Sequence, residues 1–337
     1  MMWYKNDGKD KDVAVSSRVR FARNFVDYPF EPRLNEAGAK EIIARVSAIF
    51  ENREGWKIVD FTSISPVEKM TYAEEHLVSP EFAEKKTPSA LIMNEEQGIY
   101  IMVLEEDHLR IQCIVPGLDI DEAYRRACEV DELIDRSLTY AYSEKLGYLT
   151  HCPTNLGTGM RASVMLFLPS YTKAGGIRSL QNQLGKIGLT IRGMSGENSQ
   201  ANGCLYQISN QVTLGISEEE TIKKLADVIN QISEQERGLR KQLNPEQLDA
   251  LANNAMRSIG MMVYSIRITS SELISLYRDV RLGASMGLTG NITPAKLDEL
   301  LFSSMPNTLM LGDETIKTPG DRDAKRAKIV KSILQGA

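Results

Sequence analysis

The chain has 337 residues and a net charge of −5, with 42% hydrophobic and 25% charged residues. This composition is ordinary for a soluble globular protein of two or three domains, and the acidic sum argues against a nucleic-acid-binding protein. The sequence contains no run of about 18 apolar residues, so we expect no membrane-spanning helix. Because the first residues also lack an apolar signal region, we expect a cytoplasmic protein.

The cysteines and histidines argue against two common kinds of site. The four cysteines are scattered along the chain, at Cys113, Cys128, Cys152 and Cys204. Without a Cys-x-x-Cys pair or a dense framework, reduced thiols are favoured over disulfides. The three histidines are His76, His108 and His151. They lack the spacing of metal ligands, so we expect no metal held by protein side chains.

The first part of the chain predicts a mixed α and β region. Alternation over residues 13–22 predicts a strand with Val19 and Phe21 on one face and Arg18 and Arg20 on the other. Asn35 is placed to cap a helix that runs to residue 50. Further strands are predicted at 90–93, 99–104, 109–113, 164–168, 189–192 and 205–214, and further helices at 119–145 and 179–187.

From residue 217 onward the sequence predicts only helices. They cover residues 217–242, 245–266, 270–282, 293–303 and 322–334. Ser217 and Glu220 form the pattern of a capping box at the start of the first of them. We therefore predict an α+β fold, with an antiparallel sheet flanked by helices in residues 1–215 and an all-helical C-terminal domain in residues 216–337.

The most informative segment is a glycine turn followed by an arginine. Residues 152–164 read Cys-Pro-Thr-Asn-Leu-Gly-Thr-Gly-Met-Arg-Ala-Ser-Val, which places Arg161 directly before an apolar strand. A guanidinium held beside a turn suits an anion such as phosphate. Four more arginines lie on predicted strands or turns: Arg18, Arg20, Arg110 and Arg192. Each alone is better explained as a solvated surface charge, but together they can hold a triphosphate. The sequence lacks P-loop and protein-kinase motifs, so a nucleotide site would have to be built from arginines.

Acidic residues lie beside two of these arginines. The run 105–110 reads Glu-Glu-Asp-His-Leu-Arg between two strands, and the run 192–197 reads Arg-Gly-Met-Ser-Gly-Glu after another. Each is either a plain polar loop or part of a site in which Glu106 and Glu197 face each other across a cationic substrate. We interpret His108 as a structural hydrogen-bond partner rather than a general base, because it precedes a strand within the acidic loop.

Four segments resemble the signature segments of the phosphagen (guanidino) kinases. They are residues 17–20, 105–110, 152–164 and 192–197, which follow that family's order within a likeness that extends over about residues 12–215. The resemblance implies the guanidino-kinase fold and Mg-ATP-dependent phosphorylation of a guanidinium nitrogen. It implies that the five arginines hold the ATP phosphates, that Glu106 and Glu197 bind and align the guanidinium, and that Cys152 lies beside it.

Two features resemble the bacterial protein-arginine kinases within this superfamily. Only 16 residues precede Ser17, where small-molecule members carry a helical domain that helps to enclose their substrate. Residues 322–327 read Arg-Asp-Ala-Lys-Arg-Ala, and the resemblance implies that Arg322, Asp323 and Arg326 bind phosphoarginine. Without the resemblance, a solvated basic helix is the better explanation of this last segment.

The resemblance further implies the partners of the protein. They are substrate proteins that carry arginine, such as a heat-shock repressor, together with an activator protein, a Clp-type protease and a second copy of the chain. The implied role is the marking of proteins for degradation in stress response and protein quality control. Two alternatives stay open: a kinase of free arginine or another small guanidine, and an inactive adaptor that binds phosphoarginine through residues 322–327.

Overall fold

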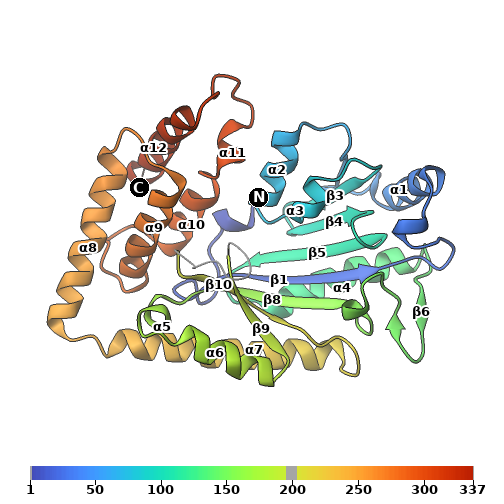
Figure 1. Cartoon of the computed structure of the whole chain (residues 1–337), viewed down its shortest axis with the longest axis horizontal. Helices are drawn as coiled ribbons and strands as arrows, with labels where there is room; N and C mark the ends of the chain where they lie inside the picture. Colours follow the sequence, from blue (N-terminus) through green and yellow to red (C-terminus); the bar gives the residue numbers. More distant parts are fainter. Residues whose placement is uncertain (1, 195–202, 337) are drawn as a thin grey trace.

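An eight-stranded sheet forms the centre of the computed structural model, which describes residues 2–194 and 203–336 (Figure 1). Every pair of neighbouring strands is antiparallel, in the order β2-β3-β4-β5-β1-β8-β10-β9. The strands are β1 (Ala14–Arg23), β2 (Lys57–Asp60), β3 (Ala90–Asn94), β4 (Ile99–Val103), β5 (Leu109–Pro116), β8 (Met160–Phe167), β9 (Leu189–Gly193) and β10 (Leu205–Asn210). The predicted antiparallel sheet is confirmed.

Strand β1 lies in the middle of the sheet, between β5 and β8. Its Val19 and Phe21 are fully buried, and the Phe21 ring meets Tyr124 of helix α4 (Ile120–Asp135) edge-on at 6.4 Å. Because side chains alternate along a strand, Arg18 and Arg20 project from the opposite face of the sheet. The predicted division of β1 into an apolar and a cationic face is therefore correct.

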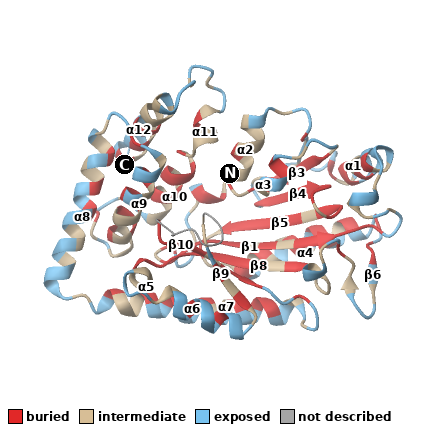
Figure 2. Ribbon diagram, viewed as in Figure 1, coloured by how far each residue is buried: buried red, intermediate tan, exposed pale blue. Residues whose placement is uncertain are grey.

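Helices pack against the sheet along its length, and the inner strands are almost continuously buried (Figure 2). The edge strand β2 is largely exposed. Helix α1 (Glu36–Phe50) packs against β2, β3 and β4, and α4 packs against β1 and β5. Helix α6 (Ile177–Lys186) packs against β9, and α7 (Glu218–Lys241) packs against β8 and β10. Asn35 caps α1 by accepting the Gly38 N–H at 2.8 Å. The predicted capping box of Ser217 and Glu220 starts α7.

Five helices form the C-terminal part of the chain, at the left of Figure 1. They are α8 (Pro245–Tyr264), α9 (Ser270–Ser285), α10 (Pro294–Phe302), α11 (Pro306–Met310) and α12 (Pro319–Gln335). The N-terminal segment packs on them, because the rings of Trp3 and Tyr4 lie 4.7 and 5.4 Å from that of Phe302. The domain division at residues 215 and 216 stays a prediction.

A buried ionic cluster joins the segment before β1 to the C-terminal helices. The Lys11 ammonium lies 2.8 Å from a carboxylate oxygen of Asp298, whose other oxygen pairs with Arg281. Arg281 also donates to the carbonyl of Lys11 at 3.0 Å. All three side chains are at most 6% exposed. Buried charges are tolerated when they are paired in this way, so the cluster fixes α9 and α10 to the sheet.

Several predicted boundaries are wrong. The strand predicted over residues 164–168 begins at Met160, so Arg161 lies within β8 rather than before it. The helix predicted over residues 119–145 ends at Asp135, because the Asp135 carboxylate accepts the Tyr140 N–H and the chain then forms the short strands β6 (Tyr142–Ser143) and β7 (Gly147–Tyr148). Strand β10, predicted to end at residue 214, ends at Asn210. The final helix begins at Pro319 rather than residue 322, since proline fits the first helical position after the N-cap Thr318.

Five further short strands and helices were not predicted from the sequence. They are β2, α2 (Pro66–Glu74), α3 (Pro80–Ala83), α5 (Pro169–Lys173) and α11. Helices α2 and α3 each start with a serine N-cap followed by proline, a recognisable signal at Ser65 and Ser79. Within the described ranges, no helix is both long enough and apolar enough to cross a membrane.

Candidate active site

The predicted arginines lie together on one face of the sheet, which we call the arginine face. Arg20 stands directly opposite Arg161 in the β1–β8 register, and Arg110 stands opposite Ala22 in the β1–β5 register. Directly opposed residues of antiparallel strands project to the same side, as do alternate residues of one strand, so Arg18 joins them. Three strands thus bring four predicted residues together.

Arg192 extends the arginine face to the edge of the sheet. It stands opposite Gln207 in the β9–β10 register, and the Gln207 amide donates to the hydroxyl of Ser163, which is the partner of Arg18. Arg161 donates to Ser209 of β10 at 3.0 Å. Arg161 and Arg192 both line a pocket of about 210 Å³. All five predicted arginines therefore belong to one surface.

The arginine face is strongly cationic. Burial, together with the neighbouring Arg161 and Arg110, lowers the pKa of Arg18 to about 10. Burial and repulsion by the charges of Arg18, Arg110 and Arg161 lower the pKa of Arg20 well below its usual range. The buried Nε of Arg20 also has no hydrogen-bond partner among the described residues. Since guanidiniums stay protonated in proteins, the cluster is a site that an anion with several oxygens would stabilise.

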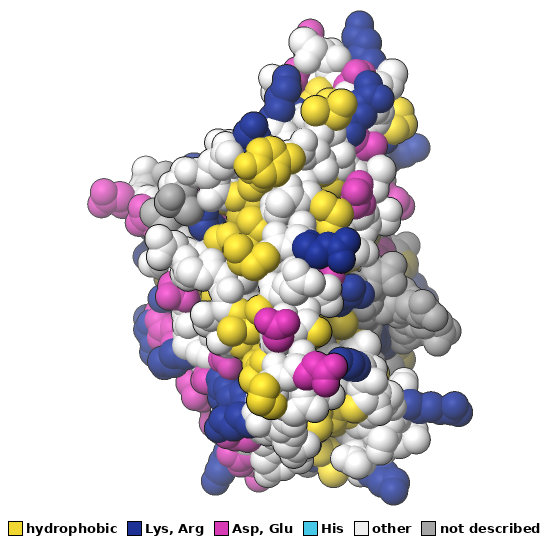
Figure 3. Space-filling view, turned by 90° about the vertical axis from the view of Figure 1, so that its left-hand side faces the viewer, with side chains coloured by type: hydrophobic (Ala, Val, Ile, Leu, Met, Phe, Trp, Pro, Cys, Tyr) yellow, Lys and Arg dark blue, Asp and Glu magenta, His cyan; other side chains and the backbone are white. Residues whose placement is uncertain are grey.

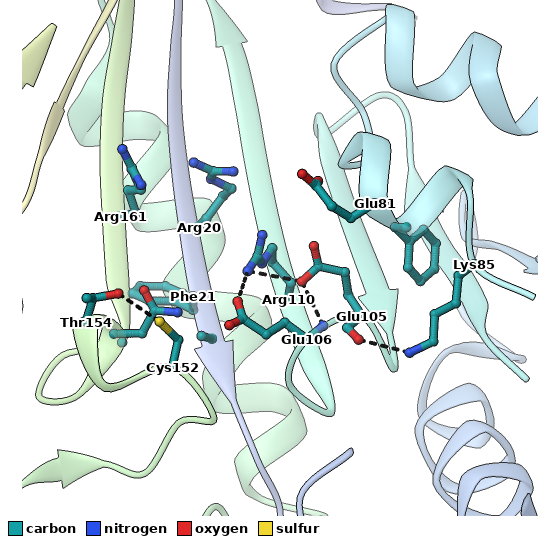
Figure 4. A pocket seen from close by; sticks show the side chains of 14 residues that line it. Arg20, Phe21, Glu81, Lys85, Glu105, Glu106, Arg110, Cys152, Thr154 and Arg161 are labelled. Carbon is teal, nitrogen blue, oxygen red and sulfur yellow. Dashed lines mark hydrogen bonds and ion pairs between the residues drawn. The ribbon is translucent and has the colours of Figure 1, made fainter. Parts of the chain in front are cut away.

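The cationic cluster opens into a pocket of about 470 Å³ that also holds three carboxylates and a thiol (Figure 4). Arg110 lies 3.0 Å from a carboxylate oxygen of Glu105 and 3.1 Å from one of Glu106. Cys152 lines the same pocket, and its sulfur lies 3.0 Å from the Thr154 hydroxyl. The structure thus brings Glu106 and Cys152 into one cavity with three of the five predicted arginines, Arg20, Arg110 and Arg161.

The turn that carries Cys152 depends on one glycine in particular. Gly157 has a φ of +101°, and a Cβ there would lie 2.1 Å from the carbonyl oxygen of Thr213. A side chain is therefore excluded, and the turn stays close to the segment that follows β10. The Thr213 hydroxyl donates to the carbonyls of Thr154 and Leu156 at 2.9 and 2.7 Å. This packing fixes the approach of the turn to Arg161.

His108 has a structural role. Its Nδ1 accepts the N–H of Phe25 at 3.0 Å, and its Nε2 donates to the carbonyl of Pro29 at 3.0 Å. Burial lowers the pKa of His108, so the ring stays neutral. Both ring nitrogens are occupied by the backbone, which confirms the interpretation of His108 as a hydrogen-bond partner.

Several residues that line the pocket of Figure 4 were not predicted from the sequence. Glu81 and Lys85, on α3 and the segment after it, line the pocket, and the Ser79 hydroxyl donates to Glu105 at 2.7 Å. No motif marks them, although the cap signal at Ser79 would have located the helix that carries them. Glu197, the second predicted carboxylate, lies outside the described residues.

The predicted phosphoarginine segment lies on α12, where its members have different surroundings. Arg326 is 1% exposed and donates to the carbonyls of Ser304 and Ile268 at 3.0 and 2.7 Å and to Asp323 at 2.6 Å. Arg322 is only partly buried. Arg326 is therefore an anchor of α12, and Arg322 is the more accessible guanidinium.

Metal-ligating side chains are not gathered in the part of the chain that the structure describes. No group of three or more histidine, cysteine, aspartate or glutamate residues there could hold an ion. Mg²⁺ commonly keeps several waters and binds through substrate phosphates. The described residues therefore fit an ion that arrives on a nucleotide rather than one held in a protein cage.

Comparisons with known proteins identify the family. Residues 39–239 match the model of the ATP:guanido phosphotransferase C-terminal catalytic domain, and residues 248–337 match that of the protein-arginine kinase McsB C-terminal domain. A protein-arginine kinase of Brevibacillus brevis is 38% identical over 338 residues, which cover 99% of this chain and 95% of that protein. One of Pelotomaculum thermopropionicum is 40% identical over 337 residues, with 98% and 94% covered. The chain belongs to the protein-arginine kinase family.

Solved structures of two guanidino kinases share the fold of this chain. A lombricine kinase superposes with a TM-score of 0.61 at 22% identity, over 71% of this chain and 70% of that one. A duplicated taurocyamine kinase of Schistosoma mansoni gives 0.62 at 23% identity, over 77% of this chain and 38% of that one. These structures confirm the predicted guanidino-kinase fold, and the curated relatives confirm the predicted kinase class.

Proposed function

We propose that this protein-arginine kinase transfers the γ-phosphoryl group of ATP to arginine side chains of proteins through the pocket of Figure 4. One observation carries the assignment of the site: the arginine face meets Glu106 and Cys152 in a single cavity. A cationic surface for phosphates and an anionic group for a guanidinium are the two halves that this reaction needs.

The chain's own residues divide the work of the reaction. Arg18, Arg20, Arg110, Arg161 and Arg192 hold the phosphates and stabilise the charge that spreads over the transferred group. Glu106 and Glu197 grip the planar substrate guanidinium, and one of them accepts its proton as the nitrogen attacks phosphorus. The new N–P bond replaces the P–O bond to ADP. Cys152 lies beside the guanidinium as a further polar contact.

Magnesium would be bound by the phosphate oxygens of ATP, where it neutralises charge on the transferred group. The protein then positions ATP and the substrate guanidinium and does not itself coordinate the magnesium ion. Because a guanidinium is a poor nucleophile while it is protonated, alignment by Glu106 supplies a large part of the rate enhancement.

The assay that tests this proposal compares two substrates. The protein is incubated with Mg-ATP and either an arginine-rich unfolded protein or free arginine, and the products are analysed by phosphorus NMR and mild-ionisation mass spectrometry. We expect phosphoarginine in the protein and little on the free amino acid. Label on free arginine alone would favour the small-guanidine kinase, whereas ATP binding without turnover would favour the adaptor.

We also propose that Arg322, Asp323 and Arg326 bind phosphoarginine, with Arg326 placing Asp323 and Arg322 contacting the phosphoryl group. The short Arg326–Asp323 contact and the accessibility of Arg322 support this division. The wider role that we propose is the marking of proteins, among them a heat-shock repressor, for a Clp-type protease in the cytoplasm during stress, with an activator protein. The family resemblance supports this role.

A homodimer completes the proposal. Apolar side chains gather along the face that α8 presents to solvent (Figure 3). The strongly exposed ones at the C-terminal half of α8 and just after it are Met256, Met261, Tyr264 and Ile266. Contiguous exposed apolar surface is typical of protein contacts, and we expect Tyr264→Ser with Ile266→Ser to shift the sedimentation coefficient toward a monomer.

A further inference from the structure

The acidic loop between β4 and β5 has an unfavourable backbone conformation at its start. Leu104 has a φ of +64°, in the left-handed region that branched side chains rarely adopt, and it is 1% exposed. The next two residues are Glu105 and Glu106, which line the active-site pocket. Such a conformation persists only where neighbouring groups hold it, so the contacts of this turn decide where the Glu106 carboxylate points.

One ammonium group holds the carbonyl side of this turn. The Nζ of Lys85 donates to the carbonyl oxygens of Leu104 and Glu105 at 2.6 and 2.9 Å. It also lies 2.7 Å from the Glu31 carboxylate. An ammonium has three N–H donors, so these three acceptors satisfy it completely. The Lys85 side chain is 15% exposed, and its position is therefore well defined.

The amide side of the turn is held from the same segment of the chain. The Glu105 carboxylate accepts the Ser79 hydroxyl at 2.7 Å and the N–H of Glu106 at 2.9 Å. Ser79 is the N-cap of α3, and Lys85 follows that helix. The segment from Ser79 to Lys85 thus contacts both the carbonyl groups and the Glu105 side chain of the turn. Figure 4 shows Lys85 beside Glu105, whereas Glu106 points toward Arg110.

We infer that Lys85 is a positioning residue: its ammonium fixes the turn at Leu104 and Glu105 and so aims the Glu106 carboxylate at the substrate guanidinium. The inference rests on the proposed function of Glu106. Lys85 acts through the backbone and does not touch the reacting atoms. Loss of its donors leaves two carbonyls and a carboxylate without their partner and allows Leu104 to relax toward negative φ.

The test compares three variants of the full chain. Lys85→Met keeps the length of the side chain and removes its donors, and Lys85→Arg keeps charge and donors. Lys57→Met is the matched control, since it removes an exposed lysine of β2 that pairs with Glu95 and does not line the pocket. For each variant we would measure kcat and KM with a protein substrate, the ATP dissociation constant by calorimetry, the melting temperature, and hydrogen exchange of the amides of residues 104–108.

The expected pattern separates positioning from general stability. Lys85→Met lowers kcat at least tenfold, speeds exchange at residues 104–108, and leaves the ATP dissociation constant within about twofold of wild type. Lys85→Arg recovers part of the rate, and Lys57→Met resembles wild type throughout. Wild-type kcat in Lys85→Met would overturn the inference. So would a loss of rate that is accompanied by clear losses of ATP affinity and melting temperature.

A second arm distinguishes failure of the inference from failure of the proposed function. If the wild-type protein transfers no phosphoryl group to protein or free arginine, the proposed function fails, while hydrogen exchange still reports whether Lys85 fixes the turn. If the wild type is active, the Lys85→Met change is repeated in a Glu106→Asp background. Because Lys85 acts through Glu106, we expect the two losses in kcat to be less than multiplicative. Fully multiplicative losses contradict the inference.

Discussion

The Asp107 carboxylate accepts the backbone N–H of His151 at 2.6 Å, and this contact joins the two loops of the active site. Asp107 follows Glu106, and His151 precedes Cys152. The same carboxylate oxygen accepts the side-chain amide of Asn24 at 2.6 Å, and Asp107 is 1% exposed. A single buried oxygen therefore sets the spacing between the Glu106 carboxylate and the Cys152 thiol, for which we proposed contacts with the substrate.

We predict that Asp107→Asn separates these loops with little change in volume. An amide accepts more weakly than a carboxylate, so the unfolding free energy should fall by about 1–3 kcal/mol. Misalignment of Glu106 and Cys152 should lower kcat about 10- to 100-fold. Chemical denaturation and steady-state kinetics measure both effects. Unchanged kcat would show that the loops keep their spacing without this contact.

Removal of a guanidinium from the arginine face should have opposite effects on stability and on nucleotide binding. Burial and like charges already disfavour the charged form of Arg20, so Arg20→Met should leave the melting temperature of the nucleotide-free protein unchanged or raised. ATP loses a charged hydrogen-bond partner worth about 1.5–3 kcal/mol, so its dissociation constant should rise at least tenfold.

The control for this change is Arg136→Met, which removes an exposed guanidinium that pairs with Glu132 at the end of α4. Thermal unfolding with and without ATP reports both quantities in one experiment. A large loss of melting temperature in nucleotide-free Arg20→Met would mean that this side chain is a structural group, and it would remove Arg20 from the proposed phosphate site.

His76 should make the stability of the protein depend on pH. Burial and the neighbouring Arg18 and Arg20 lower the pKa of His76 to about 3, against about 6.5 in an unfolded chain. Between these values the unfolded chain binds a proton that the native protein excludes, so stability is present above pH 6.5 and is lost as the pH falls toward 3. The slope approaches about 1.4 kcal/mol per pH unit.

Urea denaturation between pH 7 and pH 5 measures this slope before most carboxylates titrate. In the variant His76→Gln the slope should be smaller over the same range. An ATP phosphate beside Arg18 and Arg20 would offset their charge, so saturating ATP should also reduce the slope. Equal slopes in wild type and His76→Gln would show that His76 is not the group responsible.

Much of the fold and of the site could be predicted because their signals are local. The alternation in β1 separates Phe21 from Arg20 without any knowledge of the sheet. The capping box of Ser217 likewise predicts the start of α7 from neighbouring residues alone. Lys85 and Asp107 could not be given roles in this way. Their partners lie 19 to 54 and 44 to 83 positions away, and only the packing of α3 and of the Cys152 turn brings them together.

The same contrast applies to residues 322–327. In the sequence, Arg322 and Arg326 are equivalent members of a basic helix, four positions apart and therefore on one side. The structure separates them, because α12 packs Arg326 against the carbonyls of Ser304 and Ile268. Sequence spacing gives the face of a helix, whereas the depth to which each residue is buried depends on the helices that surround it.

We therefore predict different effects for the two arginines of α12. Arg326→Ala leaves two buried carbonyls and Asp323 without their donor, so the unfolding free energy should fall by at least about 2 kcal/mol. Arg322→Ala should change that free energy by less than about 0.5 kcal/mol, because the side chain is only partly buried. Its effect should be a loss of affinity for phosphoarginine of at least tenfold, since a charged hydrogen bond is removed.

Calorimetry with free phosphoarginine and urea denaturation distinguish the two roles, and Lys328→Ala, an exposed residue of the same helix, is the control. Basal phosphorylation of a protein substrate by Arg322→Ala should match that of wild type, because α12 contributes no residue to the pocket that holds Glu106. Wild-type affinity for phosphoarginine in Arg322→Ala would remove this residue from the proposed site. A fully stable Arg326→Ala would contradict its role as the anchor of α12.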